Sequence, residues 1–220
     1  MPVVHLVRHG QASFGTDNYD LLSPRGGVQA RAAGRELARR GVGAPMRTPV
    51  MVSGSLQRQR RTAEIIAGEL GVDGAQLLTD ERWNEFDAHA LVDSRLGGAG
   101  ASGGLTSQEF QVELDAEMRA WIDGASTSWV EFSGGALEAL RDIAARTPKG
   151  SDAIVATSAG VTAAVVGELL GLDAHGVIAL NRVSVNASIT TVISGSRGLS
   201  LLTFNDHAHF IGEGDLLTNR

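Results

Sequence analysis

The stretch that decides the fold is VVHLVRHG, residues 3–10. Its first five residues are apolar except for His5, and the β-branched valines among them favour a short buried strand. Gly10 then predicts a turn. We expect His5 to be a core histidine of a sheet. Arg8 and His9 are therefore predicted at the carboxyl end of a buried strand.

The same alternation continues along the chain. Ser23 and Pro24 form a helix start, as N-cap and first helical residue, and that helix is predicted to run to about Arg40. Further strands are expected at residues 49–53, 153–156, 188–194 and 199–204, and further helices at residues 55–70, 135–145 and 161–170. Strands that alternate with helices predict an α/β fold of three layers, α/β/α, around a mostly parallel sheet.

The middle of the chain has a different composition. Residues 97–104 are rich in glycine and are expected to form a flexible loop, and residues 106–121 carry a helical apolar pattern. We interpret residues 88–130 as a helical and glycine-rich insertion that acts as a lid. The whole of residues 1–220 is then expected to be one domain.

Composition excludes several classes of protein. The chain has 43% hydrophobic and 20% charged residues, as expected for a globular protein. Its net charge of -6 argues against nucleic acid as a partner. The longest uncharged run, residues 153–167, is too short and too polar to span a membrane, and no signal peptide is found at the N-terminus. The chain has no cysteine, so disulfides and thiolate metal sites are excluded, and we expect a cytoplasmic location.

The chemistry is expected where strands end. Ligands of open α/β sheets bind at the carboxyl ends of the strands. Three predicted ends carry polar residues: Arg8 with His9, Arg58 in the first turn of the following helix, and Ser158. An imidazole is an uncharged nucleophile near neutral pH, and arginines bind phosphoryl oxygens through two nitrogens at once. This combination favours phosphoryl transfer.

Three ordered motifs resemble the histidine phosphatase superfamily, also called the phosphoglycerate mutase-like family. They are LVRHGQA at residues 6–12, LLSPRGGVQA at residues 21–30 and SGSLQRQRRTAE at residues 53–64. The likeness covers about the first 90 residues and resumes near residue 150, which leaves the insertion unmatched in detail.

The resemblance implies a phosphoenzyme mechanism that needs no metal or other cofactor. His9 would accept the phosphoryl group, Arg8 and Arg58 would hold it, and Glu85 would protonate the leaving oxygen, with Glu81 and Asp87 as rival acids. The substrate would be a small phosphorylated metabolite or a phosphoprotein. The sequence indicates neither which one nor the oligomeric state.

The chain departs from the family pattern at Gly15, where many members have an asparagine that contacts phosphate, and at a second position of greater consequence. Members usually carry a second histidine in the turn where this chain has Ser158. A hydroxyl in place of a cationic donor is expected to slow the reaction, with Ser158 still binding phosphate, since one donor at a developing charge contributes about 10² to 10³ in rate. His207 or His209, near the C-terminus, could compensate; a metal site at this pair is not favoured, because no third ligand accompanies it.

Three other functions stay open as alternatives. The chain could be a pseudophosphatase that binds phosphate without catalysis. It could be a mutase of the phosphoglycerate type, although a mutase needs a closed site. Finally, Ser158 lies between a strand and a helix like the nucleophile of a serine hydrolase, with Asp173 and His207 following in the expected order.

Overall fold

The computed structural model describes residues 1–220 except 14–18, 45–46, 74–75, 125–126 and 220. The strands are β1 (Val3–Arg8), β2 (Val50–Ser53), β3 (Leu77–Thr79), β4 (Asp152–Thr157), β5 (Ile189–Gly195) and β6 (Gly198–Asp206). The α-helices are α1 (Pro24–Arg39), α2 (Gln57–Leu70), α3 (Ala88–Leu96), α4 (Ser107–Asp123), α5 (Thr127–Arg146), α6 (Ala159–Leu170) and α7 (Ala174–Val183). Short 3-10 helices include Glu81–Trp83, Ala101–Gly104 and Ala208–Phe210.

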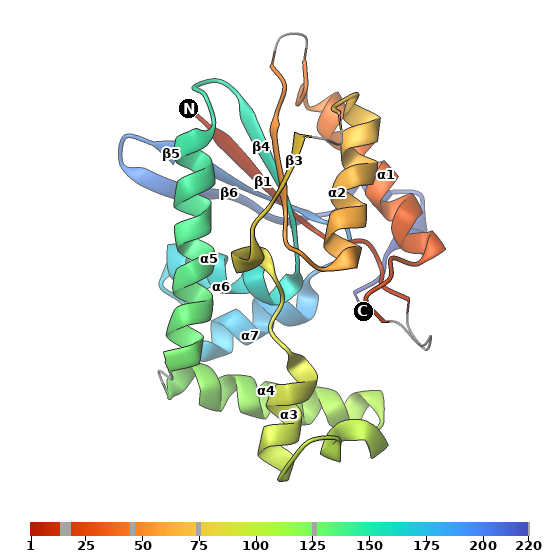
Figure 1. The fold of residues 1–220 in the computed structure, drawn as a ribbon, viewed down its shortest axis with the longest axis vertical. Helices are drawn as coiled ribbons and strands as arrows, with labels where there is room; N and C mark the ends of the chain where they lie inside the picture. Colours follow the sequence, from red (N-terminus) through yellow and green to blue (C-terminus); the bar gives the residue numbers. More distant parts are fainter. Residues whose placement is uncertain (14–18, 45–46, 74–75, 125–126, 220) are drawn as a thin grey trace.

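The strands form one sheet of six in the order β3-β2-β4-β1-β5-β6 (Figure 1). β1 and β2 both pair in parallel with β4, and β3 pairs in parallel with β2. β5 runs antiparallel to β1, and β6 antiparallel to β5. The prediction of a mostly parallel sheet is thus confirmed. β3 and α7 were not predicted, because each is short and lacks a strong apolar pattern of its own.

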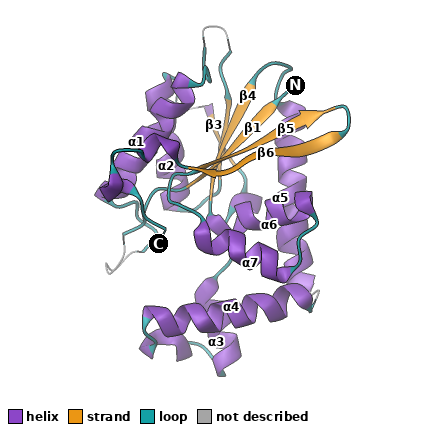
Figure 2. Ribbon diagram, turned by 180° about the vertical axis from the view of Figure 1, so that it is seen from behind, coloured by secondary structure: helices purple, strands orange, loops and turns teal. Residues whose placement is uncertain are grey.

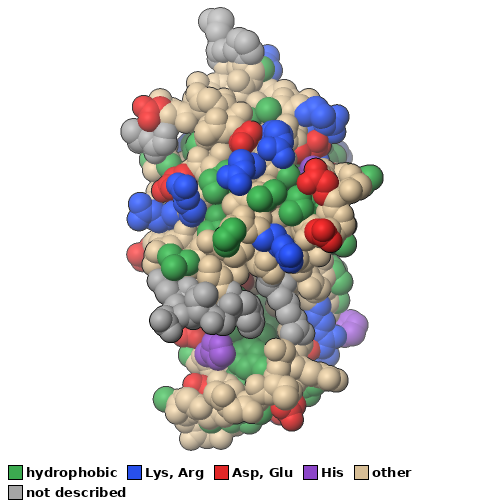
Figure 3. Space-filling model, turned by 90° about the vertical axis from the view of Figure 1, so that its right-hand side faces the viewer, with side chains coloured by type: hydrophobic (Ala, Val, Ile, Leu, Met, Phe, Trp, Pro, Cys, Tyr) green, Lys and Arg blue, Asp and Glu red, His purple; other side chains and the backbone are tan. Residues whose placement is uncertain are grey.

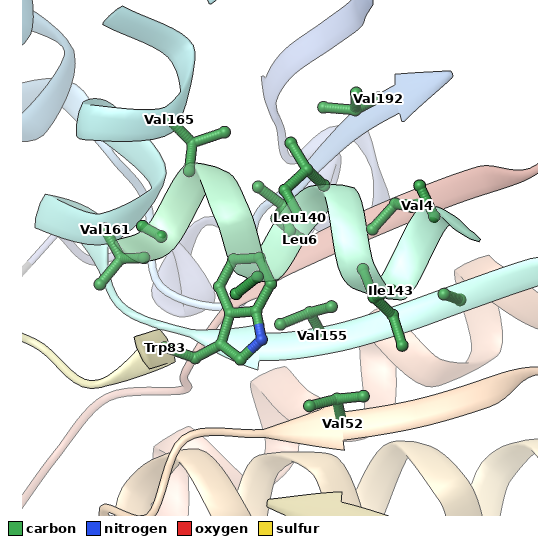
Figure 4. Packing of buried hydrophobic residues seen from close by; sticks show 14 residues of the cluster. Val4, Leu6, Val52, Trp83, Leu140, Ile143, Val155, Val161, Val165 and Val192 are labelled. Carbon is green, nitrogen blue, oxygen red and sulfur yellow. The ribbon is translucent and has the colours of Figure 1, made fainter. Parts of the chain in front are cut away.

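Helices cover both faces of the sheet, which confirms the α/β/α arrangement (Figures 1 and 2). On one face, Val4 and Leu6 of β1 pack with α5 and α6, in a cluster that includes Trp83 (Figure 4). On the other face, Val7 of the same strand packs with α1 and α2. The alternation of side chains along β1 places consecutive residues in different cores.

The segment between Ala88 and Asp123 forms a helical lobe beyond the carboxyl ends of the strands (Figure 1). The glycine-rich stretch is ordered there rather than a flexible loop. The carboxylate of Asp93 accepts hydrogen bonds from the backbone nitrogens of Gly100 (2.7 Å) and Ser102 (2.8 Å). These bonds hold the stretch against α3, a local constraint that composition alone does not reveal.

Helix α5 also differs from its predicted bounds, since it begins at Thr127 rather than near residue 135. Trp129 and Phe132 lie in its added first part and belong to a cluster that includes Ala163 of α6. α5 therefore connects the lobe directly to the body. Among the described residues, no helix is both long enough and apolar enough for a membrane span.

Gly10 lies where the chain leaving β1 meets the start of α1. A Cβ at this residue would come within 2.3 Å of the carbonyl oxygen of Gly26. We expect Gly10→Ala to lower the free energy of unfolding by about 1 to 3 kcal/mol, because backbone must move to admit the methyl group. Urea unfolding followed by circular dichroism measures this change.

Gly134 provides the matched control, since it lies inside α5 and a Cβ there would have nothing within 4 Å. Gly134→Ala is expected to raise the free energy of unfolding by about 0.5 to 1 kcal/mol through the lower helix cost of alanine. Equal stability of Gly10→Ala and wild type would show that the contact with Gly26 relaxes freely.

Candidate active site

The end of β1 positions His9 inside the protein, where it is 5% exposed. Its backbone nitrogen donates to Thr157 O at the end of β4 (2.8 Å). The side-chain Nδ1 lies 2.7 Å from Gly10 O. A carbonyl only accepts, so Nδ1 carries the hydrogen of the neutral ring and Nε2 keeps a lone pair. Arg58 Nε donates to that Nε2 at 3.2 Å.

The surroundings of His9 keep its ring uncharged. Burial lowers the pKa of His9 well below its ordinary value, and the charges of Arg8 and Arg58 lower it further, against the opposing effect of the Gly10 carbonyl. An imidazole of this kind is a nucleophile at neutral pH.

Arg58 is fixed from its other side by Asp20. Asp20 Oδ1 accepts from Arg58 Nη1 at 2.7 Å, and Oδ2 accepts from the backbone nitrogen of Gln57 at 2.8 Å. The Arg58 guanidinium also lies 5.5 Å from the ring centre of Tyr19. Sequence reasoning missed Asp20, because nothing in the local pattern distinguishes it from other acidic residues.

Arg8 is held by backbone carbonyls. Its Nη1 donates to Ser184 O (2.5 Å) and to Asn219 O (3.2 Å). The segment that contains Asn219 is anchored by Gln29, whose Nε2 donates to Leu216 O at 2.7 Å. Arg8 Nε is buried and has no hydrogen-bond partner in the described part of the chain. This nitrogen is therefore available to an oxyanion.

Glu85 reaches the same site from the loop after the 3-10 helix Glu81–Trp83. Its Oε2 accepts from the backbone nitrogen of Gly160 at 3.0 Å, and a Cβ at Gly160 would lie 2.3 Å from Oε1. Burial raises the pKa of Glu85, while the Gly160 bond and the charges of Arg58 and Arg8 oppose the rise. The protonated form of this carboxyl is therefore favoured more than that of an exposed glutamate.

The rival acids lie in different surroundings. Asp87 is exposed and accepts from Ala90 N as the N-cap of α3 (2.9 Å), and Glu81 is exposed in its 3-10 helix. The geometry therefore favours Glu85.

Ser158 follows β4 at the N-terminus of α6 and is fully buried. Its Oγ accepts a hydrogen bond from Gln59 Nε2 at 2.8 Å. Gln59 was also missed, because a buried glutamine in an amphipathic helix has the same sequence signal as an exposed one.

The histidines near the C-terminus point elsewhere. His207 Nδ1 donates to Asn205 O at 2.6 Å. His209 packs on Phe210 and lies near the charges of Asp206 and Glu36, and burial lowers its pKa. Across the described ranges, no hydrogen bond joins either ring to His9 or Arg58, so their compensating role gains no support from the geometry. The described residues contain no group of three or more histidines and acidic residues that could hold a metal ion.

The surface beside α1 and α2 is marked by a recess between the body and the lobe, with hydrophobic side chains on its floor (Figure 3). Above the recess, basic and acidic side chains are interspersed.

Comparison with known proteins agrees with the geometry. A family model described as the histidine phosphatase superfamily (branch 1) matches residues 4–207. A 2,3-bisphosphoglycerate-dependent phosphoglycerate mutase from Methylobacterium radiotolerans is 33% identical over 148 residues, which are 64% of this chain. The match spans 60% of the length of that mutase.

Solved structures share the fold at lower identity. The mycobacterial glucosyl-3-phosphoglycerate phosphatase with VO3 has a TM-score of 0.64 and 22% identity, covering 93% of this chain and 98% of its own. A mutant phosphoserine phosphatase from Entamoeba histolytica, in complex with phosphoserine, has a TM-score of 0.65 and 18% identity, covering 95% and 99%.

Arg58→Ala is expected to raise the pKa of His9 toward its ordinary value, because it removes a positive charge that disfavours the imidazolium. The titration of the His9 ring by NMR measures the shift. Arg61→Ala is the control, since Arg61 is exposed on the same helix and pairs with Glu64. An unchanged His9 titration in Arg58→Ala would mean that this charge does not act on the ring.

Proposed function

The chain belongs to the histidine phosphatase superfamily (branch 1), and we propose that it is a metal-independent phosphatase that hydrolyses phosphate monoesters through a phosphohistidine on His9. The observation that carries the proposal is the neutral Nε2 of His9, which faces Arg58 in a site that Glu85 also enters. Nucleophile, cation and acid are then all present.

In the first half of the reaction, His9 Nε2 attacks phosphorus in line with the leaving oxygen. The P–N bond forms, the P–O bond to the leaving group breaks, and Glu85 gives its proton to the departing alkoxide. The Nδ1 hydrogen bond to Gly10 O stabilises the positive charge of the phosphorylated ring. Arg58 Nε, released from Nε2, donates to a phosphoryl oxygen instead while Nη1 stays on Asp20.

In the second half, water attacks the phosphorus of phospho-His9. The Glu85 carboxylate takes one proton from the water, the P–N bond breaks, and the ring recovers its lone pair. Inorganic phosphate leaves, and both groups return to their starting protonation states.

We also propose that Ser158 takes the place of the family's second histidine. Its oxygen already accepts from Gln59, so its own hydrogen is available to a phosphoryl oxygen. A neutral hydroxyl stabilises developing negative charge less than a cation does, so a slow phosphatase is expected.

The charge of the lobe favours a phosphatase over a mutase. A phosphoglycerate-type mutase must bind a second anionic group while the phosphoryl group is transferred back. Residues 88–123 contain six acidic residues and two arginines, namely Asp93, Glu109, Glu113, Asp115, Glu117 and Asp123 against Arg95 and Arg119. Arg95 is itself paired with Glu113 and Glu117. The lobe therefore offers no surplus of positive charge.

The substrate class follows from the solved neighbours only as a proposal. They include a phosphatase bound to phosphoserine and one named for a phosphorylated sugar acid. We propose a small phosphorylated metabolite, with a phosphoprotein as the alternative.

His9→Ala should abolish turnover, because binding energy cannot replace a nucleophile. Wild type should form an acid-labile phosphoryl label that maps to His9. The control is His175→Ala, an exposed position on α7, which should keep wild-type activity. A covalent adduct at Ser158 instead would indicate a serine hydrolase, and the absence of any label or turnover a pseudophosphatase.

Glu85→Gln should lower kcat by about 10² to 10⁴ for an alkyl phosphate but far less for 4-nitrophenyl phosphate, whose leaving group needs no proton. Activity requires protonated Glu85, and burial raises its pKa, so the alkaline limb of wild type should lie above the ordinary carboxyl range and vanish in the variant. Rates across pH for both substrates measure this. Loss of the limb in Glu81→Gln or Asp87→Asn instead would transfer the acid role to that residue.

A further inference from the structure

Gln59 is a buried amide that the proposed reaction does not use. It follows Arg58 in α2 and is 0% exposed, whereas Gln57, two residues earlier, is exposed. Burying an amide costs free energy unless its hydrogen bonds are made inside the protein. The question is what the bonds of Gln59 hold together.

The amide nitrogen of Gln59 connects two other parts of the site. Nε2 donates to Trp83 O at 2.9 Å and to Ser158 Oγ at 2.8 Å. The carbonyl of Trp83 only accepts, which identifies the donating atom as nitrogen rather than oxygen. Both hydrogens of the amide are therefore used, one on the loop before Glu85 and one on the turn after β4.

The loop that carries Glu85 is attached to that turn at two points. Trp83 O also accepts from Thr157 Oγ1 at 2.8 Å, and two residues later Glu85 Oε2 accepts from Gly160 N at 3.0 Å. The Glu85 loop is thus bonded to the turn both before and after Ser158. Gln59 adds the bonds that join this loop and Ser158 to α2, the helix of Arg58.

The oxygen of the Gln59 amide, unlike its nitrogen, is buried at a cost in free energy. Gln59 Oε1 is buried and has no hydrogen-bond partner among the described residues. It packs against Gly54, where a Cβ would come within 2.0 Å of it. An apolar side chain of the same length would remove this unpaired oxygen, so stability alone does not require glutamine here.

We propose that Gln59 is a positioning residue, which holds the Glu85 loop and the Ser158 hydroxyl in register with Arg58 through its single amide nitrogen. The role rests on the proposed function, in which Glu85 is the acid. Gln59 acts through Glu85 and makes no bond to the phosphoryl group.

The test is a double-mutant cycle of Gln59→Met with Glu85→Gln, with Gln57→Met as the control. On an alkyl phosphate, Gln59→Met should lower kcat about 10-fold with KM little changed, and less than about 2-fold when Glu85 is already Gln. The alkaline limb should move to lower pH, because a loosened loop admits water to Glu85 and its pKa falls toward the ordinary value. Equal losses in both backgrounds, or the same loss in Gln57→Met, would overturn the role.

A direct titration separates this proposal from the proposed function. Carbon NMR of the Glu85 carboxyl needs no turnover, and its midpoint should be lower in Gln59→Met than in wild type. An unchanged midpoint overturns the positioning role even in an active enzyme, whereas failure of wild type to form phospho-His9 overturns only the phosphatase. If Gln59→Met does not fold, Thr157→Val removes the other side-chain donor to Trp83 O and should move the midpoint in the same direction.

Discussion

The site depends on the peptide groups at the end of β1, which are hydrogen-bonded on both sides. His9 N donates to Thr157 O on one side, and on the other Arg8 N donates to Ser188 O and Ala187 N to Arg8 O. Gly10 N then donates to Thr62 Oγ1 at 3.1 Å. These bonds to two neighbouring strands and a helix fix the backbone from which the His9 imidazole extends. Ala187, whose nitrogen makes the bond to Arg8 O of β1, has a φ of 57°, a strained conformation that alanine rarely adopts.

Burial acts on the two central groups in opposite directions. It lowers the pKa of His9 and raises that of Glu85, so both groups are favoured in their uncharged forms. In the proposed reaction, a neutral nucleophile and a protonated acid are the pair that transfers a phosphoryl group from an alkyl phosphate and releases the alcohol. The charges of Arg8 and Arg58 oppose the shift in the pKa of Glu85 and reinforce that of His9.

Local sequence predicts those parts of the molecule that local physics controls. The sequence of each element alone predicts strand β1 from its β-branched run, the start of α1 from its Ser23 cap and the end of α2 from its glycine. His9, Arg58 and Ser158 follow because strand ends and helix starts are predictable positions. Local sequence does not predict the parts that Asp20 and Gln59 play, because their hydrogen bonds form only after residues distant in sequence are brought together. The glycine-rich stretch is not predicted correctly either, because the bonds that hold it against α3 include two to the carboxylate of Asp93, a residue outside the stretch.

The loop that carries Glu85 lies between the sheet and the lobe of residues 88–123. α3 begins at Ala88, three residues after Glu85, and Phe86 between them packs edge-on against Trp121 of α4 (5.5 Å between ring centres). Glu85 accepts from Gly160 N of α6, and Trp83, two residues earlier, accepts from Thr157 of β4, so this loop contacts both the body and the lobe. If Glu85 is the acid as proposed, a lobe exchanged by recombination or by design must supply a new aromatic partner for Phe86 to leave the proton donor in place.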